Sequence, residues 1–184
     1  ARDGQLEQWC ARAAAPTVLR WQKRGLHPRQ FLHAVAAHAA KVADLGGERL
    51  SSTVKDLRQR LSRQGFERDL VANTFALVRE CAGRTLGMRH FDVQVLGGWI
   101  LLNGMVAEMD TGEGKTLTAT LPACTAALAG IPVHVVTVND YLAQRDAEAM
   151  KPLYQALGLT VGVVTRAMAV PARRQAYACA ITCC

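Results

Sequence analysis

The sequence predicts an α/β fold in which a parallel sheet is flanked by helices and is preceded by a helical segment. Three observations lead to this prediction. Amphipathic patterns of helix length fill the first half of the chain, and short apolar runs alternate with helix-length patterns in the second half. A glycine-rich loop stands near the point where the pattern changes. Uninterrupted apolar runs are typical of parallel strands whose two faces are both covered by helices.

The first half of the chain contains three or four predicted helices. Apolar residues recur at helical spacing over 28–44, over 54–64 and over 70–83, and glycines follow each of these ranges. Glycine commonly ends a helix because it adopts the left-handed conformation without steric cost. We therefore assign residues 1–87 to an N-terminal helical segment and residues 88–184 to a partial second domain.

In residues 88–184 the predicted strands and helices alternate, which indicates a doubly wound parallel sheet. The predicted strands are 105–109, 132–138, 159–164 and 178–182, and the predicted helices are 92–102, 115–129, 141–157 and 171–176. The sequence begins without Met and stops inside an apolar run, so we expect a fragment and an incomplete sheet. In such a sheet, strand 178–182 would lie on an unfinished edge.

The loop Met109–Thr116 reads MDTGEGKT and lies between a predicted strand and a predicted helix. This arrangement is typical of a phosphate-binding P-loop, in which backbone N–H groups point at phosphate oxygens. Gly112 and Gly114 would let the backbone approach the phosphates, Lys115 would reach the β- and γ-phosphates, and Thr116 would ligate magnesium. The strict motif begins with glycine where this chain has methionine. A glycine-containing turn before a capped helix is the alternative.

Three segments together resemble the first nucleotide-binding domain of the SecA family, the ATPases of bacterial preprotein translocation. They are MRHFDVQ at 88–94, MVAEMDTGEGKTLTATLPA at 105–123 and VHVVTVNDYLAQRD at 133–146. The resemblance is dense from about residue 50 to residue 182 and weak or absent over residues 1–49. It implies a partial helicase-like motor domain of the DEAD type, with ATP and Mg²⁺ as cofactors.

The resemblance also implies which residues bind or act. Lys115 and Thr116 would be catalytic, with Thr116 on magnesium. The implied cofactor-binding residues are Met88, Phe91, Gln94, Gly112, Glu113, Gly114, Lys115, Thr116 and Arg145. The Gln94 amide would read adenine, because it offers one donor side and one acceptor side to the N6 and N7 positions. Met88 and Phe91 would pack on the purine face, although core packing is equally open for each.

The sequence leaves two roles open for several residues near the loop. In the family Arg145 lies near the nucleotide, but an ion pair with Asp146 or Glu148 is equally open. The helix predicted after Thr137 can be capped at its N-terminus by the side chain of Asn139 or by that of Asp140. We expect Glu113 to shape the loop. Asp110 departs from the basic or polar residue usual in the family, which would lower affinity for phosphate but leave the fold unchanged.

The function implied by the resemblance is the ATP-binding part of a translocase motor. Its partners would be preproteins and the SecYEG channel, with a possible homodimer in the intact protein. It would be cytoplasmic and peripheral to the inner face of the cell membrane. A nucleic-acid helicase of the same motor class and a non-hydrolysing remnant are the alternatives. The segment Val138–Tyr141 favours SecA, since helicases usually have Pro after the threonine. The acidic magnesium ligand of a later strand and the arginine of a second motor domain do not occur in these 184 residues, so we expect no hydrolysis by this segment alone.

Composition narrows the remaining possibilities. Residues 1–90 hold sixteen Lys/Arg and eight Asp/Glu, whereas residues 91–184 hold six and seven. This basic surplus favours either an acidic phospholipid surface or scattered solvated arginines, and without interleaved aromatics we expect no nucleic-acid binding. The six cysteines form no Cys-x-x-Cys pair, and the histidines lack ligand spacing, so no metal centre other than magnesium is predicted. No apolar run approaches the roughly 20 residues of a membrane span, and residues 1–8 lack a signal-peptide core.

Overall fold

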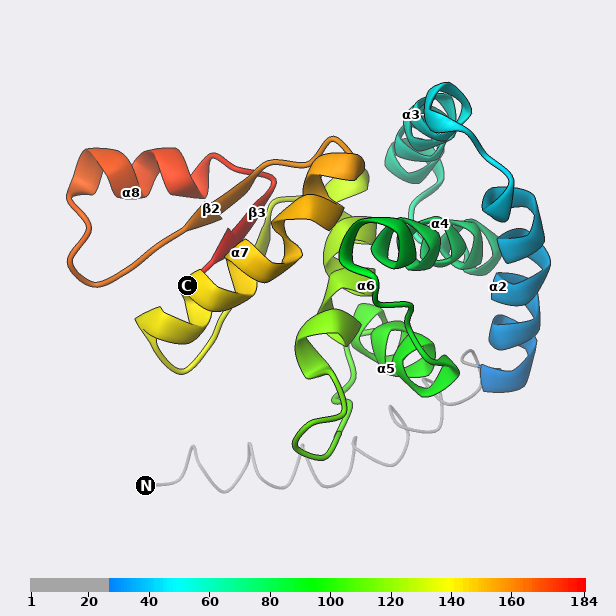
Figure 1. The fold of residues 1–184 in the computed structure, drawn as a ribbon, viewed down its shortest axis with the longest axis horizontal. Coiled ribbons are helices and arrows are strands. Elements are labelled where there is room, and N and C mark those ends of the chain that lie inside the picture. The colour runs from blue at the N-terminus through cyan, green and yellow to red at the C-terminus, as the bar shows by residue number, and fades with distance from the viewer. Residues whose placement is uncertain (1–26) are drawn as a thin grey trace, which may run out of the picture.

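The computed structural model describes residues 27–184, so the start of the predicted helical segment and Cys10 lie outside the described residues. The described helices are α2 (Pro28–Ala43), α3 (Gly47–Gln64), α4 (Arg68–Leu86), α5 (Asp92–Leu102), α6 (Lys115–Leu128), α7 (Asp140–Ala156) and α8 (Val170–Tyr177). The strands are β1 (Val133–Val135), β2 (Val161–Val163) and β3 (Ile181–Cys183). Figure 1 shows α2, α3 and α4 at one end of the molecule and the sheet with α8 at the other, with α5 and α6 between them. The α/β fold is thereby confirmed.

Helices α2 and α4 begin and end close to the predicted positions, whereas α3 begins at Gly47, before the predicted range of 54–64. Pro28 occupies the first turn of α2, where its missing N–H costs no hydrogen bond. Gly65 and Gly87 follow α3 and α4 with φ angles of 71° and 66°, which other residues rarely adopt. Within residues 27–184, no helix combines the length and the apolar character needed to cross a bilayer.

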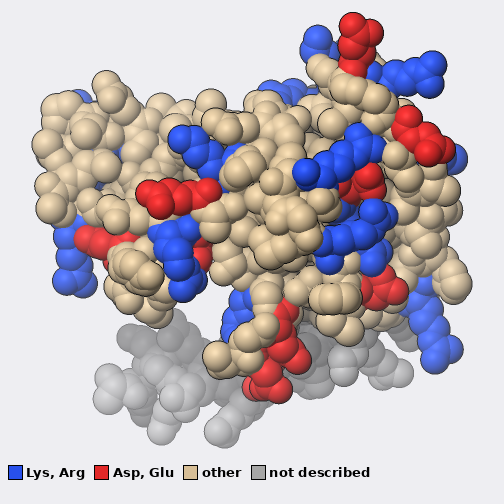
Figure 2. Space-filling view, viewed as in Figure 1, with Lys and Arg blue, Asp and Glu red and all other residues tan. Residues whose placement is uncertain are grey.

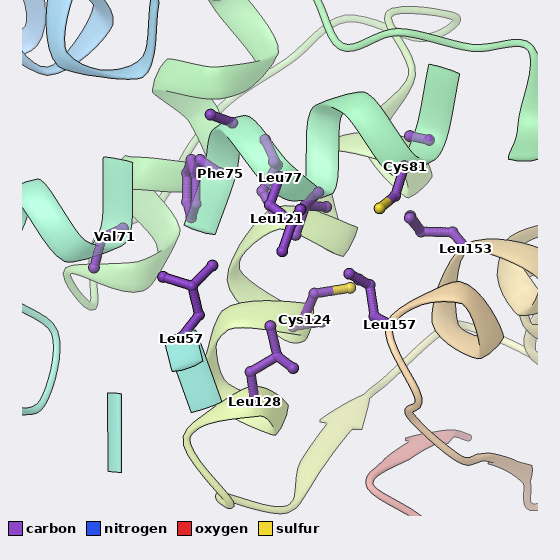
Figure 3. Packing of buried hydrophobic residues seen from close by; sticks show 14 of the residues in the cluster. Leu57, Val71, Phe75, Leu77, Cys81, Leu121, Cys124, Leu128, Leu153 and Leu157 are labelled. Atoms are coloured by element: carbon purple, nitrogen blue, oxygen red, sulfur yellow. The ribbon is translucent and has the colours of Figure 1, made fainter. Parts of the chain in front are cut away.

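Helix α4 is the centre of the hydrophobic core (Figure 3). Phe75, Leu77 and Cys81 of α4 are buried and lie among Leu121 of α6 and Leu153 of α7. One continuous cluster of buried residues extends from α2 to β3, so the helical segment and the sheet share a core. The division of the chain at residues 87 and 88 coincides with the end of α4, but it stays a prediction.

Helices α5 and α6 approach each other closely because α5 contains two consecutive glycines. A Cβ atom on Gly98 would lie 2.9 Å from Cβ of Leu121, and one on Gly97 would lie 3.0 Å from Cγ2 of Thr118. Contacts that short are overpacked, so side chains at these positions would push the helices apart. The glycines therefore determine the distance between α5 and α6.

The three strands form a parallel sheet in the order β1-β3-β2, with Ile181 opposite both Val133 and Val161. The prediction that the last strand lies on an unfinished edge is wrong, because β1 and β2 pair with both sides of β3. The predicted strand 105–109 is also wrong. A segment becomes a strand only through ladder hydrogen bonds, and in the described part of the chain no strand pairs with these residues.

Helices cover both faces of the sheet, as the apolar strands predicted. On one face, Ala143 of α7 packs against Cys183 of β3. On the other face, the Thr182 hydroxyl donates a 3.0 Å hydrogen bond to the carbonyl of Ala176 in α8. A Cβ atom on Gly162 would lie only 2.5 Å from that same carbonyl oxygen. Alternate residues of a strand face opposite sides, so α7 and α8 cover opposite faces.

We predict that Gly98→Ala lowers the free energy of unfolding by about 1–3 kcal/mol, because the new methyl group overpacks the α5–α6 contact. Gly83→Ala in α4 is the matched control, since its nearest neighbour would lie 3.9 Å away. Alanine there should leave stability unchanged or raise it by about 0.5–1 kcal/mol. Urea unfolding of both variants measures the difference, and equal effects would contradict the packing argument.

Candidate functional site

The glycine-rich loop lies between the extended residues 105–110 and helix α6, which begins at Lys115. Gly112 and Gly114 have φ angles of 91° and 80°, so both occupy the region that favours glycine. Gly114 is the N-cap of α6. The first backbone N–H groups of a helix have no intrahelical partner, and they attract anions together with the helix dipole. The loop therefore presents the geometry of a phosphate-binding site.

Two hydrogen bonds hold the loop closed around Asp110. The Lys115 ammonium donates to the backbone carbonyl of Asp110 at 2.7 Å, and the Glu113 carboxylate accepts from the Asp110 N–H at 3.1 Å. Lys115 consequently lies over the loop that it follows, where it can exchange the carbonyl for a phosphate oxygen. Glu113 contributes its side chain to the shape of the loop, and its backbone carbonyl contacts α5.

Gln94 provides that contact and is 5% exposed, so it is not a surface residue. Its Nε2 donates to the Glu113 carbonyl at 2.7 Å, and its Oε1 accepts from the N–H of Phe91 at 3.0 Å. A Cβ atom on Gly114 would lie 2.5 Å from this Nε2. One amide N–H and one lone pair of Gln94 remain beyond these two bonds. The contact between Gln94 and adenine stays a prediction.

A cavity of about 550 Å³ opens beside the loop. It is lined by Gly87, Met88, Arg89, Phe91, Val93, Gln94, Gly112, Glu113, Gly114 and Leu117. Met88 and Phe91 are 43% and 71% exposed, so they belong to the cavity wall and not to the core. The volume lies within the range of roughly 300–1,000 Å³ for small-molecule sites, and apolar walls with few polar groups are typical of them.

Arg89 adds a positive charge to this cavity that the sequence patterns did not indicate. Its guanidinium donates to the Glu80 carboxylate at 2.7 Å, and Arg84 donates to the other oxygen of Glu80 at 2.8 Å. Burial would raise the pKa of Glu80, but the hydrogen bonds from the two arginines outweigh it and lower that pKa. The charged carboxylate therefore holds Arg89 in place. The spacing of Glu80 and Arg84 is i,i+4, so the sequence could have indicated this ion pair. The ion pair between Arg89 and Glu80 has no such spacing, and no sequence pattern indicated it.

Helix α7 brings a carboxylate next to the first turn of α6. The Thr116 hydroxyl donates to Oδ2 of Asp146 at 3.4 Å. Arg145 donates to Oδ1 of Asp146 from both Nε, at 3.0 Å, and a terminal nitrogen, at 2.7 Å. Of the two acidic partners predicted for Arg145, the structure pairs it with Asp146. Whether Arg145 reaches a bound nucleotide stays a prediction.

The helix that carries these residues is fixed at its first turn by Asn139. The Asn139 side chain accepts the N–H of Leu142 at 2.9 Å, which makes it the cap of α7. Asp140 instead accepts the backbone N–H of Arg166 at 2.9 Å and so connects α7 to the segment after β2. Of the two residues predicted as possible caps, Asn139 caps the helix, and Asp140 makes the tertiary contact with Arg166.

His90 lies behind the loop and is 1% exposed. Its Nε2 is 2.9 Å from the Leu117 carbonyl and 3.1 Å from the Thr120 hydroxyl, and its Nδ1 has no partner among the described residues. Since the Thr120 hydroxyl donates to the same carbonyl at 2.6 Å, Nε2 is the protonated nitrogen. Burial lowers the pKa of His90 to about 4.

The loop, its helix and the parallel sheet define a P-loop nucleotide-binding domain. The SecA DEAD-like domain family matches residues 18–184, and the chain belongs to this family. It is 49% identical over 185 residues to protein translocase subunit SecA 2 of Bordetella avium, and the aligned region covers 98% of this chain and 27% of that protein. It is also 49% identical over 156 residues to protein translocase subunit SecA 2 of Nitrosospira multiformis, and here the aligned region covers 85% of this chain and 23% of that protein. The chain thus spans about a quarter of the length of both relatives.

We predict that His90 makes stability pH-dependent between its ordinary pKa of about 6.5 and its folded pKa of about 4. In this window the unfolded chain binds a proton at His90 and the folded chain does not, so stability falls as pH falls. The loss amounts to about 2 kcal/mol at pH 5 relative to pH 7.5.

Urea unfolding at both pH values tests this prediction, with His90→Gln as the comparison variant. Its amide nitrogen can replace Nε2 but does not titrate. The variant should lose less stability than the wild type between pH 7.5 and pH 5. Parallel losses in the two proteins would show that His90 is not the titrating group.

Proposed function

We propose that the site binds ATP with magnesium. The observation that carries this proposal is the loop with two positive-φ glycines, which lies next to a cavity of about 550 Å³ with Gln94 at its base. The loop suits phosphates, and the cavity suits a purine. Met88 and Phe91 are exposed in the cavity wall, where their apolar side chains can cover the two faces of a base.

Each residue of the site has a role that follows from its chemistry. The N–H groups of the loop and of the first turn of α6 bind phosphate oxygens, and Lys115 adds a charged donor. Thr116 supplies a hydroxyl oxygen, which fits magnesium because this ion keeps several waters and takes few protein ligands beside phosphates. When bound, magnesium would neutralise phosphate charge. Arg89 lines the cavity and is paired with Glu80, and Arg145 is paired with Asp146 next to Thr116. Figure 2 shows acidic side chains over this loop.

We infer that the intact protein is a SecA-like translocase motor that couples ATP hydrolysis to preprotein export. The family match and the two relatives named protein translocase subunit SecA 2 support this inference. Its partners would be preproteins and the SecYEG channel, and a homodimer belongs to the same proposal. The intact motor would work in the cytoplasm, peripheral to the inner face of the cell membrane. No described observation favours the helicase alternative.

Contact with acidic phospholipid is the weaker part of this proposal. Figure 2 shows Lys and Arg spread over the helical end of the molecule and interspersed with Asp and Glu. Ion pairs involve Arg60, Arg79, Arg84 and Arg89 with acidic neighbours at 2.7–3.5 Å. Because charges of both signs are interspersed on this face, scattered solvated arginines are favoured over a continuous basic surface for lipid.

We predict that Lys115→Ala weakens binding of a fluorescent ATP analogue, since each charge-assisted hydrogen bond lost costs about 1.5–3 kcal/mol. Lys151→Ala is the matched control, because Lys151 is an exposed lysine of α7 outside the site. The control should bind like the wild type. Equal affinities for the wild type and Lys115→Ala would refute the assignment of the phosphate site.

We predict that Gln94→Ala narrows the preference for ATP over GTP. The ratio of the two affinities is the useful measurement, because Gln94 also supports the loop through the Glu113 carbonyl. A loosened loop lowers the affinities for ATP and GTP by the same factor, whereas loss of a contact with the base lowers the affinity for ATP more. Competition titrations with ATP and GTP give the ratio. A ratio equal to that of the wild type would leave Gln94 a structural role only.

A further inference from the structure

Asp146 contacts Thr116 at the end of the loop, and the motifs give it no role beyond an ion pair with Arg145. Its side chain is 14% exposed, and its two oxygens have different partners. Oδ2 accepts the hydroxyl of Thr116 at 3.4 Å, and Oδ1 accepts two N–H groups of Arg145. The residue is carried by α7, whose first turn is fixed by the Asn139 cap. The carboxylate therefore lies at a fixed place beside the residue proposed to hold magnesium.

A carboxylate in this place is costly for a site that binds only phosphate. Two negative charges a few ångströms apart repel each other, and partial burial strengthens the repulsion. Arg145 offsets some of this charge, but its side chain is 52% exposed. An ion pair with a half-exposed arginine contributes modestly, so it offsets only part of this repulsion. A divalent cation between the carboxylate and the phosphates would turn the repulsion into attraction.

The hydrogen bond from Thr116 to Asp146 determines where the hydroxyl hydrogen of Thr116 lies. A hydroxyl has one hydrogen and two lone pairs. If the hydrogen is given to Oδ2 of Asp146, the lone pairs of the Thr116 oxygen point away from the carboxylate and are free for a cation. Residues in the outer shell of a metal commonly orient its direct ligands in this way.

We propose that Asp146 is a positioning residue for magnesium. It orients the Thr116 hydroxyl through Oδ2 and holds the Arg145 guanidinium through Oδ1, and its charge would favour a cation beside Thr116. This inference rests on the proposed function, because it requires nucleotide and magnesium at the loop. It distinguishes Asp146 from Glu148, two residues further along α7, which forms no hydrogen bond or ion pair with the loop among the described residues.

The test compares Asp146→Asn with the control Glu148→Gln, using a fluorescent ATP analogue titrated with magnesium and in EDTA. Asn keeps the size of Asp but removes its charge. We expect the apparent affinity for magnesium to fall about tenfold in Asp146→Asn, as for other outer-shell partners. Affinity in EDTA should be unchanged or higher, because a negative charge next to the phosphates is gone. Glu148→Gln should match the wild type in both titrations.

The ratio of affinities with and without magnesium is read within each variant, so a loss of folded protein cancels from it. Asp146→Glu, which keeps the carboxylate, should restore part of the magnesium dependence. A wild-type ratio in Asp146→Asn would overturn this inference alone. Failure of the wild type to bind the nucleotide, or equal binding by Lys115→Ala, would overturn the proposed function instead. Equal loss of binding in magnesium and in EDTA would assign Asp146 a purely structural role and also contradict the inference.

Discussion

The close contact between α5 and α6 is the constraint on which the site depends. Gly97 and Gly98 remove the side chains that would otherwise stand between the two helices. Gln94, one turn before them, is thereby brought beneath the loop, where its amide reaches the Glu113 carbonyl. The short distance between Gly114 and the Gln94 amide is a consequence of the same approach. A glycine at 114 is thus required both by its φ angle and by its neighbour.

Helix α4 connects this site to the helical segment through charge as well as through packing. Arg84 donates to the carbonyls of Ala43 and Leu45 at 2.8 Å and 2.7 Å, which satisfies the free end of α2. The same guanidinium binds Glu80, and Glu80 holds Arg89 at the cavity. The position of a positive charge in the cavity is therefore determined by α4, a helix that precedes the loop in the chain.

The loop has an unusual balance of charge for a phosphate site. Asp110 replaces the basic or polar residue expected from the family, yet the structure uses its backbone carbonyl and N–H to hold Lys115 and Glu113. Because these backbone groups are common to all residues except proline, the substitution leaves the shape of the loop intact. The negative charge of its side chain remains beside the phosphate-binding loop.

The sequence by itself determined the features that depend on neighbouring residues. Helical periodicity and terminal glycines predicted α2, α3 and α4, and the pattern MDTGEGKT predicted a loop that needs positive φ at Gly112 and Gly114. The apolar runs also predicted the approximate positions of β1, β2 and β3, but the pairing of strands depends on distant partners and was not predictable in this way. Residues 105–109 have the composition of a strand but lack a paired neighbour, and β3 was placed at an edge although it is central.

The tertiary structure alone decided which distant side chains meet. Asp146 meets Thr116 across 30 residues, and Arg89 is held by a carboxylate from the middle of α4. Neither contact leaves a periodic signal in the sequence, because it arises from the packing of separate helices. The adjacent glycines of α5 are visible in the sequence, but only the position of Leu121 on the facing helix explains why a side chain is excluded there.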